Sequence, residues 1–455
     1  MTLNINLENN LVRRFLYLIK KKFVKDVATL QVGSFFSTGL ALLGSIIYAR
    51  VLGVEGYATY ALIFAFVSLL TIFSNVGTHQ GTLTILAEAY TKQDRKKILD
   101  VLTYYVKITL LVSGLIGLII IGIAPFLTTK LYSSQEIGNL ARVIVLGDII
   151  KIFFGMYTIV LQVARRIKRL TIVENLNKAL YVIIPASAVL LGLGLKGLVF
   201  GYLITAFSFA IFALFAYRIL RRKEPLFPAW KEIFANFGKV ELGYYFKFGF
   251  LIAVDKNLAS LYSILPIFIL GIFHLEQVAF LKIAIAYAGL PAIFIGSSVS
   301  RLLAVQLPKS KSYSFKILRR DYLRSSIGSF LITSLVTIGF ILVAFLLIPL
   351  VYGQEYIPAV SLAYPLLVGA IISSLGVGIG PLFRTLNLMK KAIQINFFGV
   401  IIGSLILYYA TKNYPIEVSI YPIAFWSAII TIIFFVYLVK KLNSKAKEEN
   451  NYEQI

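Results

Sequence analysis

Apolar residues run through this 455-residue chain in long stretches that are separated by short polar gaps. A helix needs about 20 predominantly apolar residues to cross the hydrocarbon core of a bilayer. An open chain has no other way to satisfy its backbone there. The stretches predict an all-α integral membrane protein with twelve transmembrane helices. The predicted spans are 27–49, 57–76, 101–124, 142–163, 172–195, 197–217, 246–272, 277–300, 325–350, 357–383, 392–411 and 418–439.

The basic residues between these stretches fall almost entirely in alternate gaps and at the two ends of the chain. The remaining gaps hold only Arg50, Lys130, Lys196 and Lys412. Loops rich in Lys and Arg stay on the cytoplasmic side of a membrane. The pattern therefore predicts a multi-pass protein of the inner, cytoplasmic membrane with both termini in the cytoplasm. One missed helix would scramble the alternation, so the charges also support the number of spans.

Composition excludes several other classes of protein. Mean hydropathy is +0.84 and charged residues make up 14% of the chain, too few to cover a soluble globule. A net charge of +25 would indicate nucleic acid in a soluble protein, but here the charges follow membrane topology, and we expect no nucleic-acid partner. The chain has no cysteine, and His79 and His274 are isolated, so no metal and no cofactor are predicted. No phosphate-binding loop of the P-loop type occurs, which argues against ATP hydrolysis.

The longest predicted cytoplasmic gap divides the twelve spans into two sets of six. The predicted domains are a cytoplasmic amphipathic segment at 1–26, an N-terminal six-helix lobe at 27–217, a cytoplasmic linker at 218–245, a C-terminal six-helix lobe at 246–439 and a cytoplasmic tail at 440–455.

The two halves resemble each other at equivalent places. Residues 97–99 and 316–318 both read Lys-Ile-Leu, before the third and ninth spans, and Tyr132 and Tyr352 follow those spans at nearly the same offset. Such matches indicate a duplication. Each half has an even number of spans, so both share one orientation and a pseudo-two-fold axis should run along the membrane normal. Two lobes around that axis would leave a central cleft suited to alternating access.

Two oppositely charged residues lie within the fourth predicted span. Asp148 and Lys151 are three residues apart and hence on one helix face. Charges at bilayer depth are costly and usually face protein or water. One interpretation is an ion pair that lines a hydrated cavity. The other assigns a phosphate or acidic sugar to Lys151 and a coupling Na⁺ or H⁺ to Asp148.

Further ionisable residues occur in later spans. Asp255 and Lys256 are adjacent in the seventh span and point about 100° apart, so their partners should lie on other helices. Asp255 is a second candidate for ion coupling. Lys282 in the eighth span either reaches the outer interface or points into the cleft. Lys178 in the fifth span either pairs with Glu174 or contacts substrate.

The lysines at positions 151, 178, 256 and 282 together predict a cationic cavity. An anionic headgroup needs such compensation, and Lys serves phosphate well as a point charge. A carrier of organic cations would require an acidic, aromatic cleft instead. Asp148 and Asp255 keep that second reading open.

One segment, Tyr48–Tyr60, reads YARVLGVEGYATY where the first span ends and the second begins. It resembles the A-R-x-L-G-x-x-x-Y-G-x-Y signature of the polysaccharide exporters in the multidrug/oligosaccharidyl-lipid/polysaccharide (MOP) exporter superfamily, although Ala58 replaces the second-motif Gly. Physically, Gly53 and Gly56 would release the helix at the interface, while Arg50 either snorkels outward or contacts the ligand.

This resemblance implies a fold of two six-helix lobes around a central cavity. It also implies a flippase that moves lipid-linked oligosaccharide, carried on polyprenyl pyrophosphate, to the outer leaflet for cell-surface polysaccharide synthesis. Membrane lipids, Na⁺ or H⁺, and glycan polymerases are the partners to expect. The polyprenyl tail would remain in lipid through a gap between the lobes.

Two other functions remain open from the sequence. One is a cation-coupled multidrug antiporter on the same scaffold. The other is a membrane-embedded glycan-processing enzyme, which usually needs a sizeable external loop. The longest predicted external loop, at about 125–141, is short, and this favours a transporter.

Overall fold

The computed structural model describes residues 22–74, 76–293 and 296–453. These residues form helices, and none of them lies in a strand. The elements are α2 (Lys22–Thr71), η1 (Ile72–Ser74), α3 (Thr78–Thr91), α4 (Arg95–Tyr132), α5 (Gln135–Ile150), α6 (Ile152–Val163), α7 (Ile167–Ala188), η2 (Val189–Leu193), α8 (Gly194–Lys223), α9 (Trp230–Ala235), α10 (Leu242–Phe273), α11 (Leu275–Ala288), α12 (Leu290–Ile293), α13 (Gly296–Tyr313), α14 (Phe315–Tyr352), η3 (Gln354–Tyr356), α15 (Pro358–Ser373), η4 (Ser374–Gly378), α16 (Ile379–Thr385), α17 (Met389–Asn413) and α18 (Ile416–Glu453).

Within the described ranges, ten helical runs are long and apolar enough to cross a membrane. Two of them turn back on themselves: 38–74 covers parts of the spans predicted at 27–49 and 57–76, and 167–223 contains those predicted at 172–195 and 197–217. Counting those two runs twice recovers the twelve predicted passes. The all-helical, twelve-span architecture expected from the sequence is confirmed.

Glycines make both reversals. Gly53 has φ of 69° inside α2, and Gly192 and Gly194 have φ of 81° and 57° between α7 and α8, a backbone region that suits glycine best. The Ser45 Oγ and Tyr57 hydroxyl lie 2.7 Å apart. Twelve residues of straight helix would separate them by about 18 Å, so the chain must fold back at Gly53. The sequence predicted that the first helix would end at this glycine.

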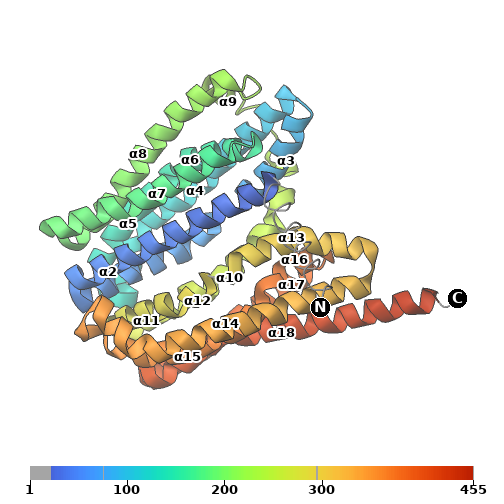
Figure 1. The fold of residues 1–455 in the computed structure, drawn as a ribbon. Helices are drawn as coiled ribbons and strands as arrows, with labels where there is room; N and C mark the ends of the chain where they lie inside the picture. The colour runs from blue at the N-terminus through green and yellow to red at the C-terminus, as the bar shows by residue number, and fades with distance from the viewer. Residues whose placement is uncertain (1–21, 75, 294–295, 454–455) are drawn as a thin grey trace, which may run out of the picture.

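The helices form two groups, α2–α9 and α10–α18, which Figure 1 shows converging at one end and spreading apart at the other. The converging end, where Ala49 meets Tyr356, is called the narrow end below. There the Tyr356 hydroxyl donates to the Ala49 carbonyl at 2.9 Å, and the rings of Phe66 and Phe268 stack 6.5 Å apart. The two lobes are therefore packed together at the narrow end. Their domain bounds remain a prediction.

The third and ninth spans support the duplication. Helices α4 and α14 each contain 38 residues, and their first and last residues are offset by 220 positions. Each is capped at its N-terminus by a side chain that accepts from the backbone N–H three residues later, Asp94 in one and Ser314 in the other. Both end in a tyrosine. The fourth and tenth spans are likewise both interrupted, at Lys151 and at η4.

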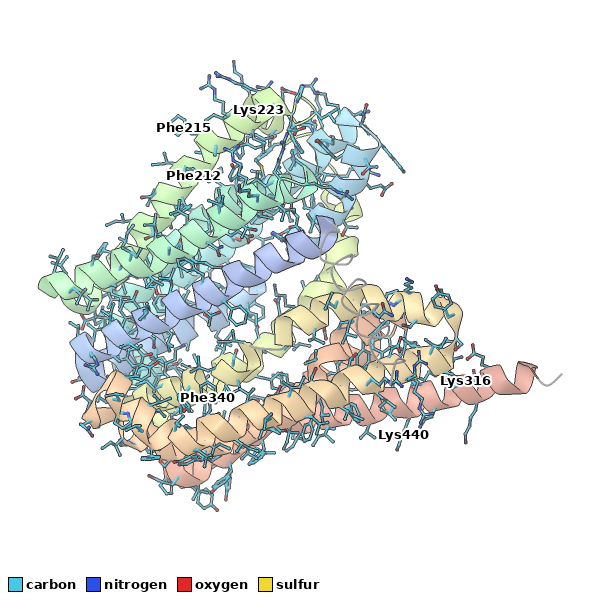
Figure 2. The ribbon with its side chains drawn as sticks, in the orientation of Figure 1. Phe212, Phe215, Lys223, Lys316, Phe340 and Lys440 are labelled. Carbon is cyan, nitrogen blue, oxygen red and sulfur yellow. The ribbon has the colours of Figure 1, made fainter. Side chains whose placement is uncertain are left out.

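Basic side chains gather where the lobes spread apart, which is called the basic end below. Figure 2 shows Lys223, Lys316 and Lys440 toward this end, whereas Phe212 and Phe215 lie along the length of α8. Phe215 is 64% exposed and belongs to a helix surface that would face lipid. The charge pattern predicts that the basic end lies in the cytoplasm.

The connection between the lobes is fastened to the basic end of the N-terminal lobe. The Tyr217 hydroxyl donates to the Pro228 carbonyl at 2.7 Å, and Arg95 pairs with Glu232 of α9 at 2.8 Å. The Asn236 amide donates to other groups of α4. Residues 224–237 are thus attached to one lobe rather than lying free between the two.

Glu224 begins this connection. Arg166 donates to it at 2.7 Å, and this hydrogen bond lowers the pKa of the Glu224 carboxyl. The Tyr90 hydroxyl donates to its other oxygen at 2.8 Å. The carboxylate at the end of α8 therefore connects the start of α7 with the end of α3.

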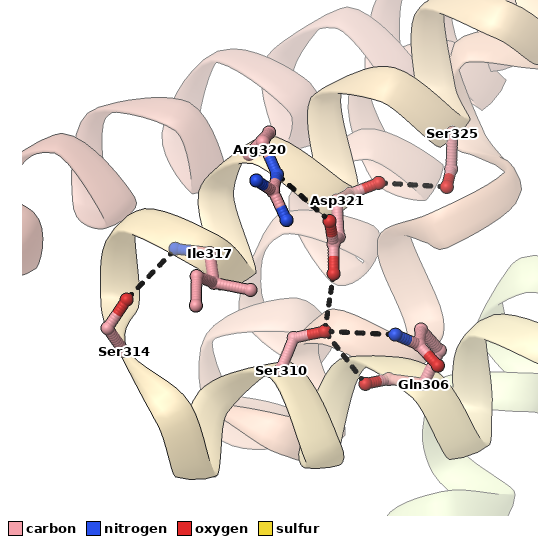
Figure 3. A network of polar contacts seen from close by, with 7 residues as sticks. All are labelled: Gln306, Ser310, Ser314, Ile317, Arg320, Asp321 and Ser325. Carbon is pink, nitrogen blue, oxygen red and sulfur yellow. Dashed lines mark hydrogen bonds and ion pairs between the residues drawn. The ribbon is translucent and has the colours of Figure 1, made fainter. Parts of the chain in front are cut away.

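A second polar network holds the turn between α13 and α14, as Figure 3 shows. The Ser310 hydroxyl donates to Asp321 at 2.7 Å, and Arg320 donates to the other carboxylate oxygen at 3.4 Å. The Ser314 hydroxyl accepts from the Ile317 amide and caps α14. The basic end of each lobe is therefore fixed by its own charged network.

The helices extend farther than the sequence predicted. The external loop expected at 125–141 is largely helical, and only Ser133 and Ser134 separate α4 from α5. Helix α18 continues to Glu453, through most of the predicted tail. Hydropathy marks the membrane part of a helix but not its polar extensions, which explains both differences. Residues 1–21 of the predicted amphipathic segment lie outside the described residues.

Candidate functional site

A small pocket in the N-terminal lobe contains the two charged residues of the fourth span. Its cavity volume is about 180 Å³, and its walls come from α2, α5, α7 and α8. The residues that line it are Phe64, Val67, Ser68, Ile144, Gly147, Asp148, Lys151, Tyr181, Tyr202 and Leu203. This set is called the N-lobe pocket.

An ion pair covered by an aromatic ring dominates the N-lobe pocket. Lys151 Nζ lies 2.7 Å from Asp148 Oδ1 and 4.8 Å from the centroid of the Tyr181 ring. Lys151 falls at the break between α5 and α6, three residues after Asp148, so helical spacing brings the two together. Their side chains remain 45% and 33% exposed, so the pair is open to the space it lines.

Asp148 also borders a second cavity, of about 270 Å³, on the other side of α5. Hydroxyl groups of Thr71, Ser74, Thr109 and Ser113 line it. Hydroxyls and a carboxylate at this depth need protein partners or water, because lipid cannot satisfy them, and the Thr71 hydroxyl donates to the Val67 carbonyl at 2.8 Å. The interior of the N-terminal lobe is therefore polar on both sides of Asp148.

The C-terminal lobe has a pocket of its own with a cavity volume of about 310 Å³. It is formed by α10, α15–α16, α17 and α18. The residues that line it are Asp255, Ala259, Tyr262, Ser373, Gly376, Ile379, Gly380, Phe383, Ala392, Asn396, Ser427, Ile430, Thr431 and Phe434. This set is called the C-lobe pocket.

An aspartate that is hydrogen-bonded to an amide defines the C-lobe pocket. Asn396 Nδ2 donates to Asp255 Oδ1 at 3.0 Å, and the Tyr262 hydroxyl donates to the Asn396 side chain at 3.2 Å. The hydroxyls of Ser373 and Ser427 lie 3.3 Å apart across the same pocket. As the sequence predicted, Asp255 finds its partner on another helix, and that partner is an amide.

Lys256 points to a different region from Asp255. Its charge acts on His79 of α3, and the neighbouring Asn257 donates to the Ile72 carbonyl at 2.9 Å. His79 and Ile72 both belong to the N-terminal lobe. Lys256 is exposed and lies where α10 meets that lobe. The structure therefore places Lys256 between the lobes, and no contact among the described residues joins it to Lys151.

Lys178 and Lys282 lie outside both pockets. Lys178 is exposed on α7, three residues before Tyr181 and therefore on the same helix face. Lys282 is partly exposed on α11, a helix that packs between α2 and α15. The interpretations of these two lysines from the sequence remain predictions.

Arg50 joins the lobes at the narrow end. It donates to the carbonyls of Val351 and Leu350 at 2.7 and 2.5 Å. The last turn of α14 has free carbonyls that such a cation satisfies well. Arg50 therefore connects the two lobes at the narrow end, and it lines neither pocket.

Several pocket residues could not be picked out from the sequence. Tyr181, Tyr202 and Tyr262 were ordinary aromatic residues within apolar spans, and Asn396 was one amide in a predicted helix. A polar side chain inside a span was the available signal, because such groups seldom face lipid. If the same criterion is applied to amide side chains as well as to charged ones, it identifies Asn396.

A family model described as "Polysaccharide biosynthesis protein" matches residues 47–361. The chain belongs to this family. The family match includes the Tyr48–Tyr60 segment and the whole N-lobe pocket, together with Asp255 and Tyr262. No curated protein matches the sequence of this family member.

Solved structures show the same fold. The chain is similar to an inward-facing multidrug resistance MATE family transporter of the MOP superfamily, with 18% identity, a TM-score of 0.71, and 90% of this chain and 96% of that chain covered. An outward-facing structure of such a transporter has 15% identity and a TM-score of 0.65, with 95% and 98% covered.

A third similar structure is a MOP superfamily transporter from Pyrococcus furiosus, described as having a binding pocket of reversed polarity. It has 15% identity and a TM-score of 0.61, and 92% of this chain and 96% of that chain are covered. By family the chain is thus a polysaccharide biosynthesis protein, and its fold is the one seen in these transporters of the MOP superfamily.

Proposed function

We propose that the protein is a flippase that moves lipid-linked oligosaccharide, carried on polyprenyl pyrophosphate, across the cytoplasmic membrane by alternating access. The observation that carries the proposal is Lys151, an amine at bilayer depth that lines an open pocket in a member of a polysaccharide biosynthesis family. A phosphorylated headgroup needs a cation in such a place.

In this mechanism the anionic headgroup enters from the basic end, which faces the cytoplasm. Lys151 and Lys256 compensate its charge from the two lobes, with Lys178 and Lys282 farther along the path. The lobes separate at the basic end and are packed at the narrow end, which supports an inward-facing state. Exchange of the open and closed ends would then release the headgroup on the outer side.

Ion coupling is assigned to Asp255 in preference to Asp148. Lys151 already neutralises Asp148 at 2.7 Å, whereas the partner of Asp255 is the uncharged amide of Asn396. The charge of Arg384 also acts on Asp255, but a carboxylate hydrogen-bonded to an amide binds Na⁺ or H⁺ more readily than one in a close ion pair. The hydroxyls of Ser373 and Ser427 lie in the same pocket and could accompany a bound cation.

The proposal is tested by glycan export in a bacterial host that lacks its own flippase. Lys151→Ala should abolish surface glycan, while Lys151→Arg and Lys130→Ala keep it. Lys130 is an exposed lysine at the narrow end and serves as the matched control. Membrane levels are measured by immunoblot. Unimpaired export by Lys151→Ala at normal membrane level would remove this residue from the mechanism.

A second candidate function is a cation-coupled multidrug antiporter. The observation that favours it is an aspartate in each pocket beside tyrosines, Asp148 near Tyr181 and Asp255 near Tyr262. Drug susceptibility in an efflux-deficient host separates the two functions. Resistance to cationic dyes that disappears with Asp255→Asn would favour the antiporter over the flippase.

A further inference from the structure

An apolar groove runs along the outside of the C-terminal lobe between α17 and α18. Its cavity volume is about 420 Å³, within the range of ligand pockets. On α17 it extends from Lys391 to Ile406, fifteen residues or about 22 Å. The hydrocarbon core of a bilayer is about 30 Å thick, so the groove spans much of its depth. Its shape suits an extended chain and not a compact ligand.

Charge is confined to one end of the groove. Lys391, at the basic end of α17, is the one charged residue among those that line it, and its Nζ donates to Gln394 Oε1 at 3.3 Å. Beyond these two residues the α17 side is apolar, with Phe398 and Ile402 next in line. A lipid with an anionic head and a hydrocarbon tail has the same order of chemistry.

A second protein helix does not fit the groove as well. Gly399 and Gly403 form the small-xxx-small pattern that often mediates helix pairing in membranes. Here Trp426 of the same chain already fills that face, and its Nε1 donates to the Gly399 carbonyl at 2.9 Å. A Cβ at Gly403 would collide with the Trp426 ring. The glycine face is therefore used within the molecule.

The groove lies next to the C-lobe pocket. Ile430 lines both, so at that point the wall between the outer groove and the inner pocket is one side chain thick. At the basic end, Lys391 lines the groove and the next residue, Ala392, lines the pocket. A headgroup held at Lys391 would lie beside the entrance to the pocket.

The apolar path also continues toward the narrow end. Phe425 borders a second groove, of about 660 Å³, on the other side of α18. That groove is lined by Ile357, Tyr364 and Tyr421 among others. The two grooves together offer a track that one long chain can follow, whereas the two shorter chains of a phospholipid would not need it.

We propose, on the basis of the function proposed above, that the α17–α18 groove is the loading site for the lipid substrate. It takes the polyprenyl chain along Phe398 and Ile402 and holds the phosphate at Lys391. The headgroup then moves from the basic end toward Lys151 while the chain stays in the groove. The tail thus lies on the outside of one lobe and not in a gap between the two.

The test is binding of radiolabelled undecaprenyl phosphate to the purified full-length protein in phosphatidylcholine nanodiscs. Lys391→Gln removes the phosphate contact, and Ile402→Trp fills the groove. Each should weaken binding about tenfold, the loss expected for one charge-assisted hydrogen bond or one blocked apolar contact. The matched controls are Lys390→Gln and Ile401→Trp, exposed neighbours that do not line the groove, and they should bind as the wild type does.

Equal binding by all four variants, or no binding by the wild type, would overturn the loading site. Displacement of the probe by an equal amount of phosphatidylglycerol would assign the groove to ordinary anionic lipid. A change of oligomeric state in Ile402→Trp with unchanged binding would assign it to a second copy of the chain. Wild-type protein that flips substrate while the groove variants bind normally would leave the proposed function standing and remove only this site. Binding with the expected variant pattern but without flipping would leave the loading site standing and remove the proposed function.

Discussion

Each lobe holds a polar pocket, and the two pockets differ in their electrostatics. In the N-lobe pocket Lys151 pairs with Asp148 at 2.7 Å and lies over the Tyr181 ring. In the C-lobe pocket Asp255 is held by the Asn396 amide at 3.0 Å. The two pockets therefore differ in charge, and their aspartates lie on the fourth and the seventh span. Under the proposed function this difference corresponds to an anionic headgroup at the N-lobe pocket and a cation at the C-lobe pocket.

Reversing the charge of Lys151 should have the largest effect. Lys151→Glu would put two carboxylates at the distance of the present ion pair, and we expect transport to fall about 100-fold from repulsion and loss of the phosphate contact. The measurement is the initial rate of substrate flipping in proteoliposomes. The swapped pair, Asp148→Lys with Lys151→Glu, restores the attraction and should recover part of the rate. Failure of the swap to recover any activity would show that the position of the amine matters more than the pairing.

The aspartates provide the sharpest contrast between the pockets. Asp255→Asn removes the charge and keeps a side chain that can hydrogen-bond to Asn396. Transport should fall about tenfold under an imposed Na⁺ or H⁺ gradient and should no longer respond to that gradient. Asp148→Asn is the matched control and should retain the response. Loss of the response in Asp148→Asn alone would assign coupling to the N-terminal lobe instead.

The aromatic cover of the N-lobe pocket should have a smaller effect. A cation over a tyrosine ring contributes about 0.5–1 kcal/mol at an exposed site, and the Lys151 side chain is 45% exposed. Tyr181→Ala should therefore weaken substrate binding about twofold to fivefold, and Tyr181→Phe, which keeps the ring, should leave it nearly unchanged. Titration of the purified protein with substrate measures both. Equal losses in the two variants would point to the Tyr181 hydroxyl rather than to the ring.

Attachment of the linker should give the smallest effect, and it depends on pH. The hydrogen bond from Arg166 lowers the pKa of Glu224, so the pair stabilises the folded protein above the unfolded pKa of a glutamate. That stabilisation is lost as the pH falls through the lower, folded pKa. Partly exposed pairs contribute about 0–1 kcal/mol. Glu224→Gln should lower the thermal midpoint by a degree or two at pH 7, and the difference should vanish in acid. A constant difference across pH would exclude the charge as its cause.

The sequence predicted the spans, the charge asymmetry and the duplication because each is a local or periodic property of the chain. It also placed Asp148 and Lys151 together, since three residues on a helix fix their spacing. It could not place Asn396 beside Asp255, because those residues are 141 positions apart and only tertiary packing joins them. Ser373 and Ser427, which are 54 positions apart, were missed for the same reason. Hydropathy also stopped short of the polar ends of α4, α5 and α18.

The central claim is that the protein moves a phosphorylated, glycan-bearing lipid with the help of Lys151. The most direct measurement uses purified protein in liposomes that contain a fluorescent polyprenyl-pyrophosphate oligosaccharide, and follows how much of it becomes protected from an external quencher. The account predicts rapid exchange between leaflets with wild-type protein and exchange near that of protein-free liposomes with Lys151→Ala. Exchange no faster than in protein-free liposomes with the wild type, or equal exchange with the variant, would contradict it.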